Sequence, residues 1–335
     1  MTVRFSTEVL RLNAASEADK LATQIRHQIA IDLGRKGAVI GLSGGIDSSV
    51  AAALCVRAVG PDRVLGLLMP EADSSDDSFR LGKMLADSQG ISAIVEDITD
   101  TLAAAGCYRR RDDALRLVVP EYTAEYRSKI VLPPATDETQ YAIFSAVVRS
   151  PSGEEKKVRL TPDAYRGIVA ATNFKQRVRS MMVYYHADRL QYAHIGTPNR
   201  LEYDQGFFVK SGDGAADLKP IAHLYKSQVY QLAEYLGVPE EIRRRLPTTD
   251  TYSMEQSQEE FYFSVPLDEM DLCLYGKNHG VPAEEIAEVI GRPVRQVAQI
   301  LRSIDSKRAA TRYLHSRPLL CEKDPLDLTL TTGTK

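Results

Sequence analysis

Residues 38–49 decide the fold, and they read Ala38-Val39-Ile40-Gly41-Leu42-Ser43-Gly44-Gly45-Ile46-Asp47-Ser48-Ser49. The apolar run at the start predicts a short buried strand. The two glycines allow a tight turn after it, and the alanine-rich stretch 50–59 favours a helix that Gly60-Pro61 ends. The stretch therefore predicts a strand, a turn and a helix in direct succession.

Strands and helices continue to alternate on both sides of this unit. In chain order we expect helix 16–33, strand 63–69, helix 74–89, strand 91–98, a helix from Pro162 and strand 192–195. Ser16 and Asp19 resemble a capping pair at the start of the first helix. Such alternation predicts an α/β fold, a doubly wound parallel sheet with helices on both faces. Residues 1–335 are interpreted as a single domain.

Residues 107–160 interrupt the alternation. They contain the basic run Arg109-Arg110-Arg111 and two strand-like stretches, 140–149 and 156–160, separated by Pro151-Ser152-Gly153. A Ser-Gly turn between two such stretches is a hairpin signal. We therefore expect a β-rich insertion at 107–160. The Thr- and Leu-rich end of the chain, 326–335, is expected to be a mobile tail.

Composition narrows the function classes. The 335 residues include 42 basic and 45 acidic side chains, a formal net charge of −3, so nucleic acid is an unlikely partner. The four cysteines lie far apart and form no C-x-x-C pair, which argues against a zinc site and a disulfide framework. No apolar stretch reaches the ~18–20 residues of a membrane helix, so no membrane is expected. Residues 1–12 lack the apolar run of a signal peptide, and we expect a cytoplasmic protein.

The turn after the first strand carries candidate chemistry. The free N–H groups of a helix N-terminus, together with the hydroxyls of Ser43 and Ser48, suit an anion such as phosphate. Asp47 is an acid in a place that otherwise favours anions, and a bound divalent cation would explain it. The spacing fits neither a Walker A loop nor the G-x-G-x-x-G dinucleotide fingerprint. A plain tight turn without a ligand is the alternative interpretation.

Several blocks of the chain resemble a known family. Residues 43–48 resemble the S-G-G-x-D-S loop of the ATP pyrophosphatases, which have the adenine nucleotide alpha hydrolase-like fold and adenylylate their substrates. The later blocks are similar to those of the NAD synthetases: Asn173-Phe174-Lys175-Gln176-Arg177, Ile195-Gly196-Thr197, Glu202, Gly206-Phe207-Phe208-Val209-Lys210, Gly212-Asp213-Gly214, Leu224-Tyr225-Lys226 and Pro247-Thr248-Thr249-Asp250. The resemblance spans roughly residues 17–308 outside the insertion.

The resemblance implies a role for each matched residue. ATP would be bound by Gly41, Leu42, Ser43, Gly44, Gly45, Ile46, Asp47, Ser48, Thr197, Lys226 and Thr248. Asp47 and Glu202 would hold Mg²⁺. Deamido-NAD would contact Arg177, Lys210, Asp217, Ser306 and Lys307, and Asp213 would face the incoming ammonia. The implied catalytic residues are Asp47, Lys226 and Asp213.

Each of these roles has a physical reason, and several of the residues also have an interpretation that involves no ligand. Glu202 is a hard oxygen ligand that follows a strand end, where open α/β sheets bind ligands. Lys226 is a point charge suited to phosphate, although a solvated lysine at a helix start looks the same in sequence. Most lysines and arginines are surface residues, so Lys210 and Arg177 share that alternative. Asp213 between two glycines could equally be a turn residue.

One block departs from the family pattern. Asp305-Ser306-Lys307-Arg308 stands where the family has x-H-K-R, so a serine replaces the histidine. Three alternatives stay open: an ATP-pyrophosphatase amide synthetase acting on another carboxylate, a tRNA-modifying member of the superfamily with the run 109–111 on RNA, and a nucleotide-binding protein without turnover. Release of AMP and pyrophosphate with deamido-NAD and ammonia would separate them.

The implied reaction is an ATP-dependent amide synthesis. The nicotinate carboxylate of deamido-NAD is adenylylated and then amidated by ammonia, which gives NAD⁺, AMP and pyrophosphate. The segment ahead of residue 16 is too short for a glutaminase domain, so we expect free ammonia or a separate ammonia donor. The resemblance also implies a homodimer, and the helix from Pro162 offers a partner the apolar side chains of Val169, Met181, Met182 and Tyr185.

Overall fold

The computed structural model describes residues 5–132, 144–248, 251–319 and 321. Its central sheet has four parallel strands in the order β3-β2-β1-β7. The strands are β1 (Ala38–Gly41), β2 (Val64–Leu68), β3 (Ser92–Val95) and β7 (Ala193–Ile195). In the register, Val39 pairs with Leu65 on one side and with His194 on the other. The predicted parallel sheet is confirmed.

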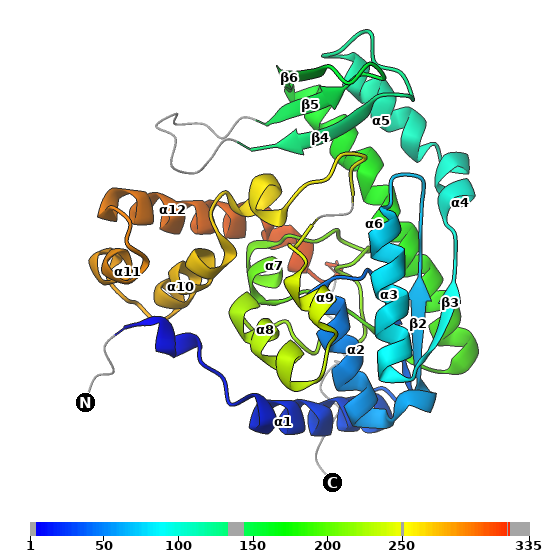
Figure 1. Ribbon diagram of the computed structural model, residues 1–335, viewed down its shortest axis with the longest axis vertical. Helices are drawn as coiled ribbons and strands as arrows, with labels where there is room; N and C mark the ends of the chain where they lie inside the picture. The colour runs from blue at the N-terminus through cyan, green and yellow to red at the C-terminus, as the bar shows by residue number, and fades with distance from the viewer. Residues whose placement is uncertain (1–4, 133–143, 249–250, 320, 322–335) are drawn as a thin grey trace.

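Helices cover both faces of this sheet (Figure 1). On one face, α1 (Ala14–His27), α2 (Ile46–Val59), α3 (Asp76–Gln89) and α8 (Lys226–Tyr235) form a core that includes Ala38 and Ile40. On the other face, Val183 and Ala187 of the long helix α6 (Pro162–Leu190) pack with Val39. Successive side chains of a strand point to opposite faces, so β1 contributes to both cores. The predicted doubly wound arrangement is therefore confirmed.

The first helix differs from its prediction at both ends. It begins at Ala14, and Asn13 caps it by accepting a hydrogen bond from the Ser16 N–H at 3.1 Å. The expected capping pair of Ser16 and Asp19 is therefore wrong, because the cap lies one turn earlier. A π-helical turn at Gln28–Asp32 follows, and Gly34 with φ +60° ends it.

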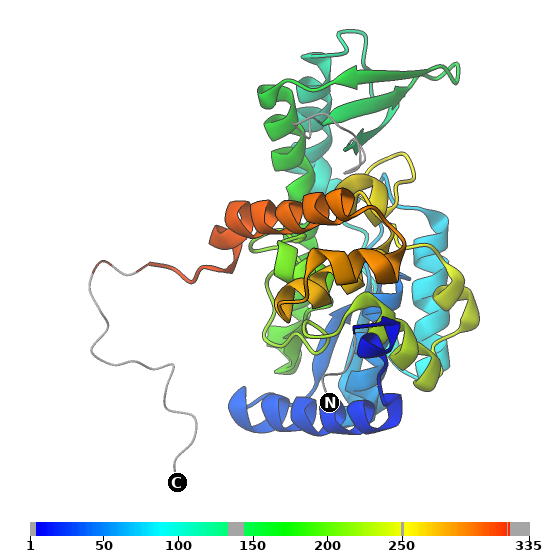
Figure 2. The same ribbon diagram turned by 90° about the vertical axis from the view of Figure 1, so that its left-hand side faces the viewer.

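A second apolar cluster lies among the C-terminal helices. α10 (Leu267–Asn278), α11 (Ala283–Ile290) and α12 (Val294–Thr311) pack around Met270 and Ile300. Figures 1 and 2 show α12 at mid-height, above α1. The short helices and turns are η1 (Thr7–Leu10), η3 (Pro61–Arg63), α4 (Thr99–Ala104), α7 (Arg200–Gln205), α9 (Glu240–Arg244), η4 (Glu259–Phe263) and η5 (Arg312–His315).

The predicted insertion is β-rich only in its second part. It opens with helix α5 (Cys107–Arg116), which carries the basic run. Three strands follow, β4 (Arg127–Val131), β5 (Ser145–Arg149) and β6 (Glu155–Arg159), in an antiparallel sheet. The β5–β6 hairpin matches the prediction, whereas β4 was not predicted. Residues 140–143 of the expected first strand lie outside the described residues.

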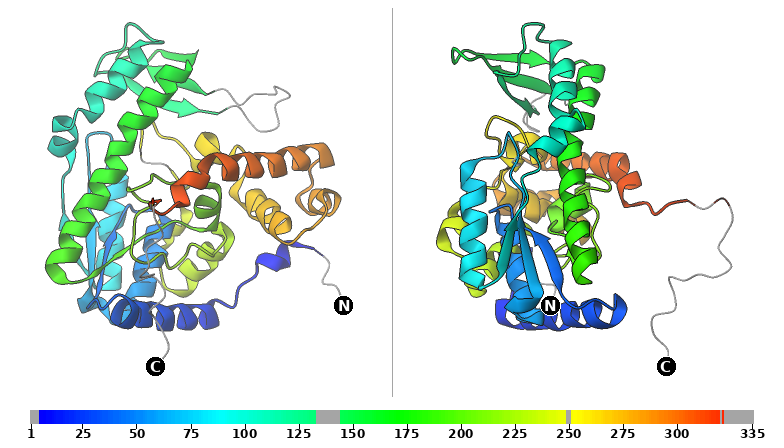
Figure 3. Two further views of the ribbon diagram at one scale, coloured as in Figure 1. Left: turned by 180° about the vertical axis from the view of Figure 1, so that it is seen from behind. Right: turned by 90° about the vertical axis from the view of Figure 1, so that its right-hand side faces the viewer.

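Helices α5 and α6 connect this small sheet to the core. Figure 3 shows the sheet at one end of the molecule, with α6 running from it past the central sheet. Arg111 of α5 is buried and pairs with Asp73 at 2.5 Å and with Asp112 at 2.9 Å. The arginine run is therefore not a continuous solvated strip for RNA.

Three further features concern the chain as a whole. Among the described residues, no helix combines the length and the apolar character needed to cross a bilayer. Cys55, Cys107 and Cys273 are buried free thiols, and Cys321 is an exposed one. The expected mobile tail, 326–335, lies outside the described residues.

Candidate active site

The main cavity lies where the strand order reverses. The chain passes from β1 to β2 and β3 on one side and later returns to β7 on the other. The segments after β1 and β7 therefore diverge, and ligands of open α/β sheets bind at such a switch point. A cavity of about 1040 Å³ is present there, lined by Ser43 and Asp47 after β1 and by Gly196 and Glu202 after β7.

The loop between β1 and α2 depends on its glycines. Gly44 has φ +71°, and a Cβ at this position would lie 2.7 Å from the Ser78 carbonyl oxygen. Glycine is therefore required here. The Ser48 and Ser49 hydroxyls donate to the Gly45 carbonyl at 3.0 and 2.8 Å, directly before α2 begins. Gly45, Ile46 and Asp47 line the cavity at the start of α2, so the positive end of this helix borders it, which suits phosphate.

Asp47 and Lys226 form a buried ion pair in this cavity. Lys226 is the first residue of α8, and its Nζ lies 2.5 Å from Asp47 Oδ2 with only 2% of the lysine side chain exposed. Asn199 Nδ2 donates to the other carboxylate oxygen at 3.1 Å. Burial lowers the pKa of Lys226, but the charges of Asp47 and Glu202 outweigh it and raise the pKa above its usual value. Lys226 is therefore a buried cation rather than a solvated helix-start lysine.

Glu202 is the second carboxylate of the site. It forms a capping box with Asn199 at the start of α7, with hydrogen bonds of 3.2 and 3.0 Å in the two directions. Gln258 Nε2 donates to Glu202 Oε1 at 2.9 Å. Burial, together with the negative charge of Asp47, raises the pKa of Glu202 to about 8. A cation beside the two carboxylates would relieve this repulsion.

Most of the other predicted site residues line the same cavity. From the loop these are Gly41, Leu42, Ser43, Gly45, Ile46 and Ser48, and from later segments Arg177, Thr197, Lys210, Asp213, Thr248, Ser306 and Lys307. Lys307 Nζ lies 4.7 Å from the centre of the Tyr262 ring, and burial lowers the pKa of Lys307 to about 7. Burial raises the pKa of Asp213 to about 6.

Two predicted site residues do not line the cavity. Gly44 acts through its backbone, as described above. Asp217 accepts hydrogen bonds from the His194 N–H at 2.8 Å and from the Tyr184 hydroxyl at 3.5 Å. Its contact with the dinucleotide stays a prediction. Thr249 and Asp250, from the same block as Thr248, lie outside the described residues.

The match to known proteins covers most of the chain. A family model described as NAD synthase matches residues 17–141 and 151–311. The chain belongs to the NAD synthase family. Within the predicted insertion, the match leaves out residues 142–150. The family resemblance seen in the sequence is confirmed, and the tRNA-modifying alternative is set aside.

Two relatives are similar over nearly the whole chain. An NH(3)-dependent NAD(+) synthetase of Rhizobium meliloti (strain 1021) is 57% identical over 318 residues, which covers 95% of both chains. That of Mesorhizobium japonicum is 57% identical over 312 residues, covering 93% of this chain and 98% of the relative.

Two solved structures share the NAD synthase fold. The NH3-dependent NAD synthetase from Campylobacter jejuni, in complex with the nitrate ion, has a TM-score of 0.60 at 20% identity and covers 93% of this chain and 100% of that one. The NMN synthetase from Francisella tularensis has a TM-score of 0.60 at 24% identity, with 92% and 99% covered. At these identities the likeness concerns the fold alone.

The donor set of this NAD synthase family member fits a Mg²⁺ ion that is bound with a nucleotide. Asp47 and Glu202 offer hard carboxylate oxygens, the ligands that Mg²⁺ prefers. Within the described ranges there is no cluster of three or more His, Cys, Asp or Glu side chains that could hold a metal. Two carboxylates leave positions for phosphate oxygens and water, as is usual for Mg²⁺ at nucleotide sites.

Sequence reasoning missed three residues that hold the site together in this family member. Asn199 contacts both carboxylates, Gln258 holds Glu202, and Asp271 accepts from the backbone N–H of Lys226 at 3.0 Å. The spacing of Asn199 and Glu202 matches a capping box, so that signal was present in the sequence. Gln258 and Asp271 reach the site from distant segments and carry no local signal.

Proposed function

We propose that the chain is an ammonia-dependent NAD synthetase. It adenylylates the nicotinate carboxylate of deamido-NAD with ATP and amidates the product with ammonia, giving NAD⁺, AMP and pyrophosphate. The observation that carries this proposal is the buried pair of Lys226 and Asp47 beside Glu202, at the start of the phosphate-binding helix. Relatives that bear this activity in their names, at 57% identity, support it.

The first step forms an acyl-adenylate. A carboxylate oxygen of deamido-NAD attacks the α-phosphorus of ATP, and the bond from that phosphorus to the bridging oxygen breaks, which releases pyrophosphate. Lys226 and the N–H groups at the start of α2 stabilise the negative charge on the phosphate oxygens. Asp47 and Glu202 would hold Mg²⁺, which supplies Lewis-acid stabilisation of the same charge.

The second step uses ammonia as the nucleophile and needs no covalent enzyme intermediate. The nitrogen attacks the acyl carbon, loses a proton, and AMP leaves with the oxygen that joined it to the acyl group. Asp213 borders the cavity and its pKa of about 6 leaves it ionised near neutral pH. We assign it the task of attracting ammonium and accepting its proton.

Basic side chains around the cavity suit the dinucleotide. Arg177, Lys210 and Lys307 offer positive charge to its pyrophosphate, and Ser306 offers a hydroxyl where the family has a histidine. Lys210 also donates to the Tyr313 carbonyl at 2.8 Å, so it ties the segment after α12 to the site. The family resemblance also implies that Asp217 contacts the dinucleotide.

We also propose a homodimer. Helix α6 exposes 52% of Met181 and 60% of Tyr185, a few residues from the cavity-lining Arg177. A self-complementary contact along α6 would cover these side chains. Light scattering at micromolar concentration should give the dimer mass for the native chain and the monomer mass for Tyr185→Asp. Tyr235→Asp, at a comparably exposed position on α8, should stay dimeric, and a monomeric native chain would overturn the proposal.

The nitrogen source tests the proposed function. The purified chain, given ATP, Mg²⁺ and deamido-NAD, should make NAD⁺ from ammonium chloride and none from ammonia-free glutamine. Glutamine use requires an amidase nucleophile. A parallel reaction with nicotinate mononucleotide tests another carboxylate. Comparable NAD⁺ formation from glutamine would contradict the proposal. So would AMP release that occurs with nicotinate mononucleotide but not with deamido-NAD.

We place this reaction in the cytoplasm. The free thiols of Cys55, Cys107, Cys273 and Cys321 favour a reducing compartment. Ammonia would come from solution or from a separate donor protein.

A further inference from the structure

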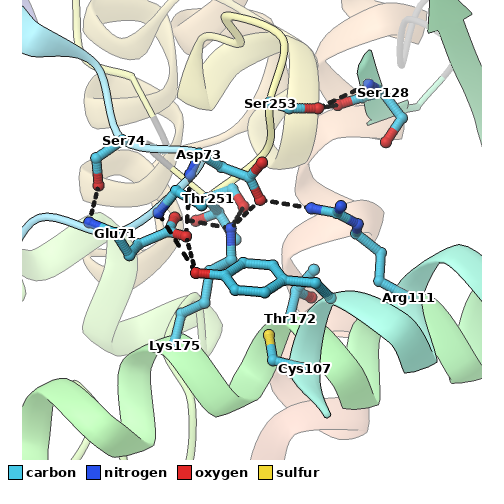
Figure 4. A network of polar contacts seen from close by, with 12 residues as sticks. Glu71, Asp73, Ser74, Cys107, Arg111, Ser128, Thr172, Lys175, Thr251 and Ser253 are labelled. Carbon is cyan, nitrogen blue, oxygen red and sulfur yellow. Dashed lines mark hydrogen bonds and ion pairs between the residues drawn. The ribbon is translucent and has the colours of Figure 1, made fainter. Parts of the chain in front are cut away.

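A buried charged network joins α6, α5 and the loop after β2 (Figure 4). Its centre is Lys175 on α6, whose side chain is 0% exposed. Lys175 Nζ donates to Glu71 Oε1 at 2.8 Å, to Asp73 Oδ2 at 2.6 Å and to the Thr251 carbonyl at 2.8 Å. An ammonium group has three N–H donors, so these contacts use all of them.

Helix α5 closes the network from the side of the small sheet. Arg111 Nη1 lies 2.5 Å from Asp73 Oδ2, and the Tyr108 hydroxyl donates to Glu71 Oε2 at 2.9 Å. Burial raises the pKa of Asp73, but the charges of Lys175 and Arg111 outweigh it and hold the pKa below its usual value. Asp73 is therefore an ionised carboxylate between two buried cations, and its position depends on both.

The network joins two segments that border the cavity. Glu71 and Asp73 belong to the loop after β2, which presents Pro70 and Ser74 to the cavity. Thr251 lines the cavity from the opposite segment. Glu71, Asp73 and Lys175 are not among the lining residues, so any effect on a ligand passes through neighbouring segments, which are these two and the lining part of α6 at Asn173 and Gln176.

The loop after β2 lies next to the phosphate-binding loop. It leads into α3, where the Ser78 carbonyl lies against Gly44 so closely that only glycine fits. A shift of this loop would therefore disturb the nucleotide side of the cavity. The catalytic groups have separate supports, since Asn199 holds Asp47 and Gln258 holds Glu202.

We propose that Lys175 is a positioning residue that fixes both rims of the nucleotide pocket and so sets the affinity for ATP. The rate of the saturated enzyme depends on groups that Lys175 does not touch. This inference rests on the proposed function in taking ATP as the nucleotide.

The test uses a charge-balanced variant of the full chain. Lys175→Met alone would leave the fully buried Glu71 without its cation, so it is combined with Glu71→Gln, whereas Asp73 keeps its pairing with Arg111. Calorimetric titration with an ATP analogue whose α,β-bridge cannot be cleaved, in the presence of Mg²⁺, measures Kd without turnover. We expect a melting temperature close to the native one and a Kd raised about ten-fold or more. In turnover assays, kcat and the KM for deamido-NAD should stay within about two- to three-fold of native values.

Matched variants complete the test. Arg166→Met, on the same helix but 72% exposed and paired with Asp163, should leave the Kd unchanged. A folded Lys175→Met/Glu71→Gln chain with a native Kd for the analogue would overturn the proposal. So would an equal rise in the KM for deamido-NAD, because general loosening would then explain both.

If the double variant does not fold, a variant that removes no charge tests the same proposal. Tyr108→Phe removes one hydroxyl that holds Glu71, and it should raise the Kd about two- to three-fold. An unchanged Kd in that variant would then overturn the proposal. A native chain that binds the analogue but makes no NAD⁺ would count against the proposed function and not against the role of Lys175.

Discussion

The Asp47 carboxylate joins the two halves of the site. One oxygen contacts Lys226 Nζ, and the other accepts from Asn199, which follows β7. A neutral amide of the same shape could keep a contact with Asn199 but would lose the charge that faces Lys226. Substitutions at Asp47 can therefore separate the effect of charge from the effect of shape.

We predict that Asp47→Ala abolishes turnover and that Asp47→Asn lowers kcat/KM by at least ~10²-fold. The reason is that the proposed Mg²⁺ site loses one of its two carboxylates beside the phosphates. Steady-state kinetics over a Mg²⁺ titration measure the effect, with the exposed Asp62→Asn as the control. Normal activity of Asp47→Ala at ordinary Mg²⁺ would refute the assignment.

Asp213 gives the folded chain a pH-dependent stability. Burial raises its pKa from 3.8 to about 6, so the neutral form favours folding. Its contribution to the free energy of unfolding is complete below pH 3.8 and is lost as the pH rises through 6. At ~1.4 kcal/mol per pKa unit, this loss amounts to about 3 kcal/mol. Asp213→Asn can still accept from the Val209 N–H but does not titrate. Denaturant unfolding should therefore show the Asn variant gaining stability relative to the native chain from about pH 4 to about pH 7; a constant difference would contradict this.

Residues in local motifs could be predicted, and residues held by distant contacts could not. Asp47 and Glu202 stand in short recognisable blocks, and the structure brings them together. Gln258 is 56 positions from Glu202, and Asp271 is 45 positions from Lys226. Nothing in their neighbouring sequence indicates the partner, because only the folded chain makes the contact.

Helix α8 shows how an element directs the side chain of Lys226, to which we assign a catalytic role. Its N-terminus leaves N–H groups without helical partners. Asp271 of α10 accepts from the N–H groups of Lys226 and Ser227 at 3.0 and 2.7 Å. This cap from another helix fixes the start of α8, and with it the direction in which Lys226 points.

We predict that Asp271→Ala lowers the free energy of unfolding by about 1–2 kcal/mol, because it removes this cap. It should also lower kcat, since Lys226 loses its fixed direction. Urea unfolding and steady-state kinetics measure the two effects. Glu234→Ala, 77% exposed on the same helix, should change stability by no more than ~0.5 kcal/mol. Equal effects of both substitutions would show that Asp271 is not a cap.

Sequence patterns predicted the core elements and the β5–β6 hairpin, but not α5 and β4 of the insertion. β4 reads Arg127-Ser128-Lys129-Ile130-Val131, in which the only apolar side chains are those of Ile130 and Val131. Its Ser128 N–H donates to Ser253 Oγ at 2.9 Å, a contact with a distant loop. Arg111 of the basic run is buried, because Asp73 and Asp112 neutralise its charge, and this contact with a distant loop has no local signal in the sequence.

The arrangement of the whole chain explains why one cavity collects so many segments. α6 extends from the small sheet past the central one, and the views in Figure 3 agree on this. Leu132 and Phe144 of the small-sheet region line the cavity together with the loop after β1. The parallel topology could be predicted, since βαβ connections leave few choices. The position of the small sheet could not, because it follows from side-chain contacts between distant segments.

Attack of the carboxylate on the α-phosphorus of ATP leaves an isotopic trace. Deamido-NAD with ¹⁸O in both nicotinate carboxylate oxygens would be converted by the purified chain with unlabelled ATP, Mg²⁺ and ammonium chloride. Mass spectrometry of the products then locates the label. We predict one ¹⁸O in the phosphate of AMP, the other in the amide of NAD⁺, and none in pyrophosphate. NAD⁺ formed with unlabelled AMP, or label in pyrophosphate, would contradict the mechanism.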